Sequence, residues 1–243
     1  MNKFCENLIM GTFRLFYPAK YYGLEHIPEG RAVFVCNHFF ALDPLFVFSV
    51  YQKKGDIYFL AKKELFRKKW AGDILKEFGA IPVDRENVDL QTMMAALRAL
   101  KEDHKLVIFP EGTRNKKDDA LQELKGGAAI FAVRTKSPIV PVMMLKRARL
   151  FRRTKLIFGE PFEFSEYYGK KLTEEDYRKL DAELREKMIA LQSQLKALCA
   201  KKKGRNGIRT ERCKRVLFRG DGCGRENGVA EGGRRLPSGR DHT

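Results

Sequence analysis

The sequence contains little cysteine, and its cysteines have no pattern that indicates a disulfide framework or a zinc site. There are five in 243 residues, an odd number, and no two have the C-x-x-C spacing. Structural zinc sites and disulfide-rich secreted domains both depend on regularly spaced cysteines. We therefore expect reduced thiols. Cys36, inside the apolar run 32–36, is predicted to be a small core residue.

Long apolar runs are also missing. No uninterrupted apolar stretch approaches the roughly 20 residues that a helix needs to span a bilayer. The first residues include Lys3 but also Glu6, and no small-residue cleavage site follows the apolar part, so we expect no signal peptide. The sequence has no internal repeat, helix-turn-helix, zinc-finger spacing or aromatic RNA-binding block. These absences argue against a membrane-spanning or nucleic-acid-binding protein.

Basic residues are in large excess. Lys and Arg number 48 against 31 Asp and Glu, a net charge of +17, which favours nucleic acid, anionic lipid headgroups or phosphorylated substrates as partners. Residues 201–243 hold 13 basic residues against 5 acidic ones and nine of the 20 glycines. Apolar residues are too sparse there to offset the entropy of ordering. We predict a disordered tail, either a lipid or nucleic-acid tether or a segment without an essential role.

Short apolar strands alternate with helical patterns between residues 20 and 200. The expected strands are 32–36, 57–61, 80–83, 105–109, 139–144 and 155–158. Continuous apolar strands separated by helices indicate a single α/β domain with a mostly parallel, mixed sheet flanked by helices. Residues 1–19 are predicted to hold an amphipathic helix that packs on the core or lies in a lipid interface. Thr173 is expected to cap a long helix that ends near residue 198.

Three polar segments each follow a predicted strand, where ligand sites of open α/β sheets gather. The first contains His38 and Asp43, which would point about 140° apart on one helix. They meet only if His38 lies in a turn and Asp43 begins the next helix, a start that Pro44 favours. The carboxylate would then hold one imidazole nitrogen and leave the other to take a proton. In the alternative, Asp43 is only a helix cap and His38 only a turn residue.

The other two segments offer groups that suit an anion. Residues 79–85 end in Arg85, whose planar guanidinium suits a phosphate, although it is equally a solvated surface arginine by its position. Residues 109–115 contain Gly112, which permits close backbone approach, beside amides, a hydroxyl and a guanidinium. The alternative for this third segment is an ordinary polar turn.

In this order the segments resemble the glycerolipid acyltransferase family typified by bacterial 1-acylglycerol-3-phosphate acyltransferase. That family has an Asn-His-x-x-x-x-Asp block, a Gly-x-Ile-x-x-x-Arg block, a Phe-Pro-Glu-Gly-Thr-Arg block and a Pro-Ile-Val-Pro-Val-like block. The matching residues here are 37–43, 79–85, 109–114 and 138–142. Residues 61–65 are similar to the family's stretch between the first two blocks. The resemblance covers roughly residues 20–165, and no motif position departs from it.

The resemblance implies transfer of a fatty acyl group from acyl-CoA or acyl-ACP to the sn-2 hydroxyl of 1-acylglycerol-3-phosphate, giving phosphatidic acid for phospholipid synthesis. His38 is then the general base, oriented by Asp43. The substrate-binding residues that it implies are Asn37, Lys62, Arg85, Glu111, Gly112, Thr113 and Arg114. Lys62 is equally a solvated lysine. The transfer is expected to be direct, without a covalent acyl-enzyme, and no metal or cofactor is expected besides the thioester.

The same resemblance implies several partners and a location. The partners are lysophosphatidic acid, the acyl thioester, an anionic membrane surface and, as a donor, acyl carrier protein; nucleic acid is not expected. The location is the cytoplasmic side of a membrane, with peripheral or monotopic attachment. Basic residues alternate with Trp70, Leu150 and Phe151 in the clusters 67–70 and 146–155, a mixture that fits an anionic lipid interface, although most charge runs are solvated surface.

Three alternatives stay open at this stage. The first is the same chemistry on another lysophospholipid or on glycerol-3-phosphate. The second is a basic nucleic-acid-binding protein, which the pI of about 9.7 and the Arg/Gly-rich tail invite. The third is a lipid-binding protein without catalysis.

Overall fold

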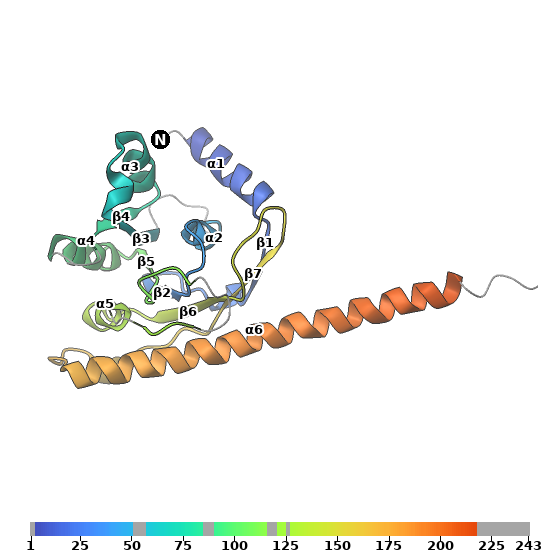
Figure 1. Cartoon of the computed structure of the whole chain (residues 1–243). Helices are drawn as coiled ribbons and strands as arrows, with labels where there is room; N and C mark the ends of the chain where they lie inside the picture. Colours follow the sequence, from blue (N-terminus) through green and yellow to red (C-terminus); the bar gives the residue numbers. More distant parts are fainter. Residues whose placement is uncertain (1–2, 51–56, 85–89, 116–120, 125–126, 218–243) are drawn as a thin grey trace, which may run out of the picture. The chain divides into compact units, whose positions relative to one another are not determined.

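Seven strands form one sheet within the residues that the computed structural model describes, which are 3–50, 57–84, 90–115, 121–124 and 127–217. The strands are β1 (Ala19–Tyr22), β2 (Ala32–Cys36), β3 (Ile57–Lys62), β4 (Ala80–Val83), β5 (Lys105–Ile108), β6 (Ile139–Met144) and β7 (Thr154–Phe158). Their order is β1-β7-β6-β2-β5-β3-β4 (Figure 1). All neighbouring strands are parallel except β6 and β7. The predicted α/β class with a mostly parallel, mixed sheet is confirmed.

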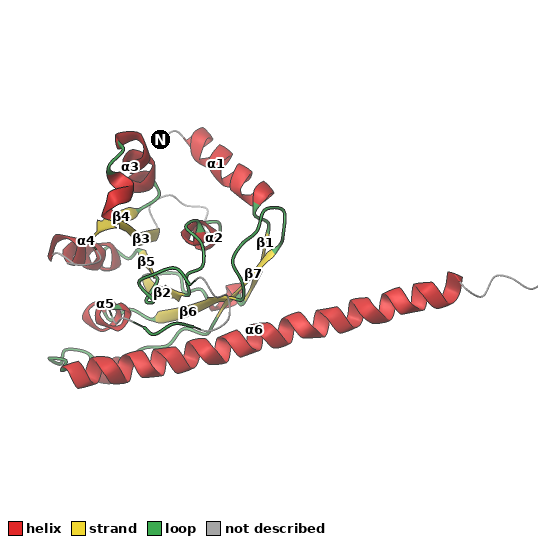
Figure 2. Cartoon of the chain, viewed as in Figure 1, coloured by secondary structure: helices red, strands yellow, loops and turns green. Residues whose placement is uncertain are grey.

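Helices cover both faces of this sheet (Figure 2). They are α1 (Lys3–Phe16), α2 (Asp43–Phe48), α3 (Lys69–Glu77), α4 (Leu90–Lys101), α5 (Ala128–Thr135) and α6 (Glu174–Leu217), with 3-10 turns η1 (Leu24–His26), η2 (Lys63–Phe66) and η3 (Ser165–Tyr167). On one face the core contains side chains from α4, α5 and α6. On the other it contains side chains from α1, α2 and the end of α3.

The central strand β2 shows why the sheet is buried on both faces. Val33 and Val35 belong to one core cluster, whereas Phe34 and Cys36 belong to the other, as the two-residue period of a strand requires. All five residues of β2 are buried. Because β2, β5 and β3 are parallel neighbours, their carboxyl ends lie at one edge of the sheet. The polar segments that follow these ends are thereby brought together.

Two boundaries differ from the sequence-based expectation. β1 is not among the expected strands, because the residues after Pro18 predict only a polar connection, but it pairs in parallel with β7, with Ala19 opposite Thr154. Its four residues are all half-buried and contain no apolar run, because an edge strand is held mainly by backbone pairing. The sequence also predicts one helix over residues 64–78, but this stretch is divided into η2 and α3 because Lys68 adopts an extended conformation before α3.

Helix α1 packs on the core along one side. Met10 and Phe13 are buried in the cluster beneath it, whereas Leu8 and Leu15 are 58% and 69% exposed. The sequence allowed α1 either to pack on the core or to lie in a lipid interface. The helix packs on the core with one face and leaves apolar side chains exposed on another. None of the described helices is both long enough and apolar enough to cross a bilayer.

Helix α6 begins as predicted and ends later than predicted. The Thr173 hydroxyl accepts the backbone N–H of Asp176 at 3.2 Å, and the Thr173 N–H donates to the Asp176 carboxylate at 2.8 Å. The helix continues to Leu217, into a separate unit of residues 200–243. The tail was predicted to be disordered because it has few apolar residues. Its Lys and Arg residues nevertheless favour a helical backbone, which explains the later end of α6. The rest of the predicted disordered tail, 218–243, lies outside the described residues.

Candidate active site

His38 and Asp43 meet in the turn between β2 and α2. Helix α2 begins at Asp43, with Pro44 in its first turn, and His38 lies in the turn before it. The His38 Nδ1 and the Asp43 Oδ2 are 3.0 Å apart. The same Oδ2 accepts the backbone N–H groups of Phe39 and Phe40, each at 2.7 Å. The predicted contact is confirmed, and the turn's own amides fix the carboxylate that orients the imidazole.

This geometry sets the roles of the two ring nitrogens. With Nδ1–H donating to the buried Asp43 carboxylate, Nε2 is the nitrogen left to exchange a proton. The carboxylate also stabilises the imidazolium that forms when Nε2 is protonated. The His38 ring packs against Phe109, with ring centroids 4.4 Å apart, and forms part of a cavity wall. The pair can therefore act as an oriented general base at the surface of that cavity.

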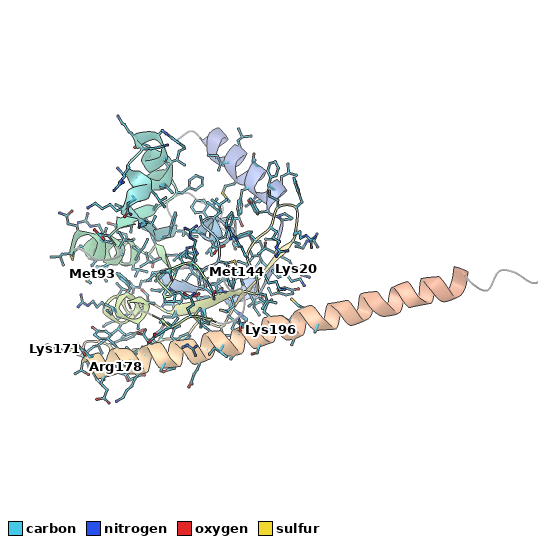
Figure 3. The ribbon with its side chains drawn as sticks, in the orientation of Figure 1. Lys20, Met93, Met144, Lys171, Arg178 and Lys196 are labelled. Carbon is cyan, nitrogen blue, oxygen red and sulfur yellow. The ribbon has the colours of Figure 1, made fainter. Side chains whose placement is uncertain are left out.

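Asn37 fastens the start of the turn to the neighbouring strand. Its side-chain amide donates to the Met144 carbonyl at 2.9 Å and accepts the Met144 N–H at 2.8 Å. Met144 is the last residue of β6 and is labelled in Figure 3. Asn37 is 2% exposed and is not among the residues that line the cavity. The residue expected to bind substrate is thus placed where it positions the turn that carries His38.

The segment that follows β5 holds the backbone of His38. The His38 N–H donates to the Glu111 carboxylate at 3.0 Å, and the Asn115 N–H donates to the His38 carbonyl at 2.7 Å. Glu111 is 1% exposed, and this burial raises the pKa of its carboxyl above the usual range. Gly112 has a φ of +65°, which a residue with a side chain adopts only with strain, and it carries the turn past Glu111. Glu111, expected to bind substrate, is thus placed where it holds the backbone of the turn that carries His38.

A mostly apolar cavity of about 340 Å³ opens beside His38. Its walls come from α1, α2, β3, η2 and α3, and they include Leu45, Phe59, Leu65, Leu75 and Phe78. The only polar or charged side chains among the described lining residues are those of His38, Lys62 and Arg114. Such a cavity can hold a hydrocarbon chain along its length and a charged group at its polar end.

The residues with cationic side chains at the cavity differ in their surroundings. Lys62 is half exposed, and its ammonium lies 3.0 Å from the Glu64 carboxylate. Arg114 is exposed. Thr113 is also exposed, and its hydroxyl donates to the Gln122 side chain at 3.2 Å. The structure thus brings Lys62 and Arg114 to the same cavity as His38, whereas Arg85 lies outside the described residues.

Cys36 is close to the pair but is not a suitable nucleophile. It is 1% exposed, and burial, with a smaller contribution from the Asp43 charge, raises the pKa of its thiol well above the usual range. A thiol of this kind does not supply the thiolate that nucleophilic catalysis requires. In the described part of the chain, no three His, Cys, Asp or Glu side chains gather where they could bind a metal ion.

Comparison with known proteins assigns the family. The family profile described as Acyltransferase matches residues 18–145, more than half of the chain. The chain belongs to the acyltransferase family. The matched region contains His38, Asp43, Glu111 and Arg114 and the whole of all four motif blocks, so the resemblance noted in the sequence is confirmed.

Relatives of this acyltransferase include enzymes of one name. The 1-acyl-sn-glycerol-3-phosphate acyltransferase of Bacillus subtilis is 35% identical over 173 residues, which are 69% of this chain and 85% of that protein. The protein of the same name from Streptococcus pneumoniae is 33% identical over 165 residues, 65% of this chain and 60% of that protein.

A solved structure supports the fold of this acyltransferase. The crystal structure of the 1-acyl-sn-glycerophosphate (LPA) acyltransferase PlsC from Thermotoga maritima superposes with a TM-score of 0.54. The two sequences are 23% identical, and the match covers 76% of this chain and 78% of the other. At this identity the likeness concerns the fold alone.

Sequence reasoning missed some residues of the site. Asn115, which donates to the His38 carbonyl, is a buried polar residue one position beyond the third motif. The α3 wall, with Ile74, Leu75 and nearby Phe78, was predicted only as a helix. No pattern in the sequence shows which cavity a helix face will line.

Proposed function

We propose that this acyltransferase transfers a fatty acyl group from an acyl thioester to the sn-2 hydroxyl of 1-acylglycerol-3-phosphate, giving phosphatidic acid. The observation that carries the proposal is the His38–Asp43 pair in the wall of an apolar cavity that Arg114 also lines. The names of the Bacillus and Streptococcus relatives support the choice of acceptor. The thioester is acyl-CoA or acyl-ACP, and no other cofactor is needed.

The transfer is a direct displacement. The His38 Nε2 takes the proton of the acceptor hydroxyl as that oxygen attacks the thioester carbonyl carbon. The carbon–sulfur bond then breaks, and the departing thiolate takes the proton back from the imidazolium, so that an ester and a free thiol are formed. Asp43 holds the ring through both proton transfers. No side chain is acylated, in keeping with the buried Cys36.

The cavity supplies binding as well as placement. Its apolar walls receive a fatty chain, which gains about 0.8 kcal/mol for each methylene removed from water. Arg114 and Arg85 bind the acceptor phosphate, and Lys62 adds charge at the same end. Glu111, Gly112 and Thr113 form the turn that precedes Arg114, and Asn37 positions the separate turn that carries His38. A charge-assisted hydrogen bond to phosphate contributes about 1.5–3 kcal/mol.

The substrates place the enzyme at a membrane. Lysophosphatidic acid and its two-chain product both partition into lipid, so the enzyme meets them at the cytoplasmic surface, as a peripheral or monotopic protein. The net charge of +17 suits an anionic surface. Acyl carrier protein is the candidate protein partner if it carries the donor.

The deciding experiment compares wild type with His38→Ala in the acylation of lysophosphatidic acid. Loss of the general base should lower kcat about 10²–10⁴-fold or more, with an unchanged circular-dichroism melting curve. His104→Ala is the matched control, because His104 lies outside the cavity, and it should retain activity. Near-full activity of His38→Ala would remove the mechanism.

A panel of acceptors with one thioester tests the substrate. We expect the highest kcat/KM with lysophosphatidic acid, lower values with other lysophospholipids, and the lowest with glycerol-3-phosphate. A preference for another acceptor would replace the proposed substrate while leaving the role of His38 in place.

A further inference from the structure

The loop between β6 and β7 presents two large apolar side chains to solvent. Arg149 and Arg152 form an isolated bridge across a tight turn, in which the Arg152 N–H donates to the Arg149 carbonyl at 3.1 Å. Leu150 and Phe151 form the tip and are 55% and 69% exposed. Phe151 has a φ of +57°, an unfavourable conformation for a bulky side chain. Such strain persists only where the surrounding structure holds the residue in that conformation.

The tip is fixed to the end of α1. The Phe151 N–H donates at 2.7 Å to the carbonyl of Phe16, the last residue of that helix, and the two rings lie 5.3 Å apart. The Thr154 N–H donates to the Pro18 carbonyl at 2.8 Å, which anchors the base of the loop as well. Figure 1 shows the loop alongside this end of α1. Leu15 and Leu150, the neighbours of these two rings in sequence, are exposed as well, and we call Leu15, Phe16, Leu150 and Phe151 the loop–helix patch.

Cations surround the loop–helix patch. The exposed basic residues of the loop are Lys146, Arg147, Arg149, Arg152 and Arg153. No acidic residue occurs between positions 145 and 155. Arg147 lies over the Phe40 ring at 5.3 Å, so the basic group reaches the turn that contains His38. Apolar side chains ringed by arginine match a surface with anionic headgroups above a hydrocarbon layer.

The loop–helix patch also connects to the catalytic cavity. Ile9, on α1, lines the cavity together with His38. Tyr17, directly after α1, packs against Phe40 with ring centroids 5.6 Å apart. Helix α1 therefore contributes to both the loop–helix patch and the cavity wall, so a surface bound by the patch also lies against the helix that borders the cavity.

We infer that the loop–helix patch inserts into the headgroup region of an anionic bilayer, with Leu150 and Phe151 as the inserted tip and the loop arginines at the phosphates. The inference rests on the membrane location proposed above, but not on the chemistry assigned to His38. An acidic carrier protein would also be attracted by the arginines, and it is one outcome of the test.

The first test is co-sedimentation of the full chain with phosphatidylcholine vesicles, with and without phosphatidylglycerol. Leu150→Ser/Phe151→Ser should lower the partition coefficient on anionic vesicles at least about tenfold. The matched control is Leu90→Ser/Met94→Ser, two residues on α4 that are 73% and 53% exposed, and it should bind as wild type does. Equal binding of the tip variant and wild type would overturn the inference.

The second test changes charge alone. Each basic residue near an anionic surface contributes about fivefold to partitioning, so Arg152→Glu/Arg153→Glu should lower it on the order of 25-fold or more. Lys170→Glu/Lys171→Glu makes the same change at exposed positions after η3 and should have a much smaller effect. The inference would be contradicted if the partition coefficient of wild type changed neither with phosphatidylglycerol content nor with added salt.

A fluorescence measurement locates the tip. The chain has a single tryptophan, the 67% exposed Trp70, so Phe151→Trp in a Trp70→Phe background reports on position 151 alone. We expect a blue shift on anionic vesicles and quenching by lipids with bromine in the upper acyl chain. An unshifted spectrum on vesicles that bind the protein would exclude insertion of the tip.

Activity separates this inference from the proposed function. With a short-chain, water-soluble lysophosphatidate, the tip variant should keep the kcat of wild type, whereas with vesicle-embedded acceptor its rate should fall with its binding. If the tip variant bound vesicles normally and lost only turnover with acyl carrier protein as donor, the loop–helix patch would be a carrier-protein site instead. If wild type bound vesicles through the tip but acylated no acceptor, the inference would stand and the proposed function would not.

Discussion

The polar residues behind His38 and those at the cavity rim differ in burial and in hydrogen bonding. Asn37, Asp43 and Glu111 are at most 2% exposed, and each is hydrogen-bonded to backbone groups of the catalytic turn or of β6. Lys62 and Arg114 are exposed and come from separate segments, at the end of β3 and after β5.

Under the proposed mechanism, this difference separates the residues that orient the base from those that bind the headgroup. A base that is oriented before substrate arrives needs no reorganisation during the reaction, and this is where enzymes gain most of their electrostatic advantage. Long exposed cations can instead adjust to a lipid headgroup, and they cost side-chain entropy when they do so. Substitutions behind His38 should therefore alter kcat and folding, whereas those at the rim should alter use of the acceptor.

The largest effect is expected from Asp43→Asn. The amide keeps the size of the side chain but no longer stabilises the imidazolium, so kcat should fall on the order of 10²–10⁴-fold. Steady-state rates with saturating substrates measure this, and Asp73→Asn, an exposed position on α3, is the control. A change confined to the KM of the acceptor would place Asp43 with the rim residues.

Asn37→Ala should destabilise the fold. It leaves the buried N–H and carbonyl of Met144 without their partner, which costs about 1–3 kcal/mol for a group of this kind. We expect a loss of about 2–4 kcal/mol in the free energy of unfolding by urea denaturation. The exposed Asn7→Ala should change it by less than about 0.5 kcal/mol. Normal stability with poor acceptor binding would instead support direct contact of Asn37 with substrate.

Arg114→Ala tests the rim. Loss of a charge-assisted bond to phosphate should lower kcat/KM for the acceptor roughly 10–150-fold, from about 1.5–3 kcal/mol. Lys62→Ala should have a smaller effect, because its ammonium is exposed and already paired with Glu64.

Kinetics with each substrate varied in turn check this, with the exposed Arg98→Ala as the control. A loss seen only in the KM for the thioester would show that Arg114 binds the donor.

Asp181 lies on α6, far from the His38 turn in sequence. Burial raises the pKa of its carboxyl from 3.8 to about 6. Between about pH 4 and 6 the folded protein holds a proton that the unfolded chain has lost, so stability falls as pH rises through this window. Asp181→Asn should thus raise the free energy of unfolding at pH 7 by about 1 kcal/mol, after allowance for solvent screening.

The stabilisation by Asp181→Asn should vanish below about pH 4, where the carboxyl is protonated in both states. Thermal melts of the variant and wild type at both pH values measure it. An equal gain at the two pH values would trace the effect to packing rather than to charge.

The convergence of the polar segments around His38 was predictable from sequence, whereas the contacts of Asn37 and Glu111 and the cavity were not. Polar motifs after short apolar strands had to converge, because parallel strands end at one edge, and Pro44 indicated where α2 begins. The spacing did not show whether the Asn37 amide faces substrate or backbone, since both uses need the same residue type. β1 was missed because its edge pairing depends on a distant strand.

Part of the cavity wall comes from elements that do not hold His38 or Asp43. Helix α3 and strand β3 form one side, whereas His38 and Asp43 are held by amides of the turn between β2 and α2 and by Glu111 and Asn115 after β5. A substitution at Leu75 or Ile74 changes the room for a hydrocarbon chain without touching any hydrogen bond of the pair. The length or shape of the chain that fits the cavity can therefore change while the hydrogen bonds of His38 and Asp43 stay as they are.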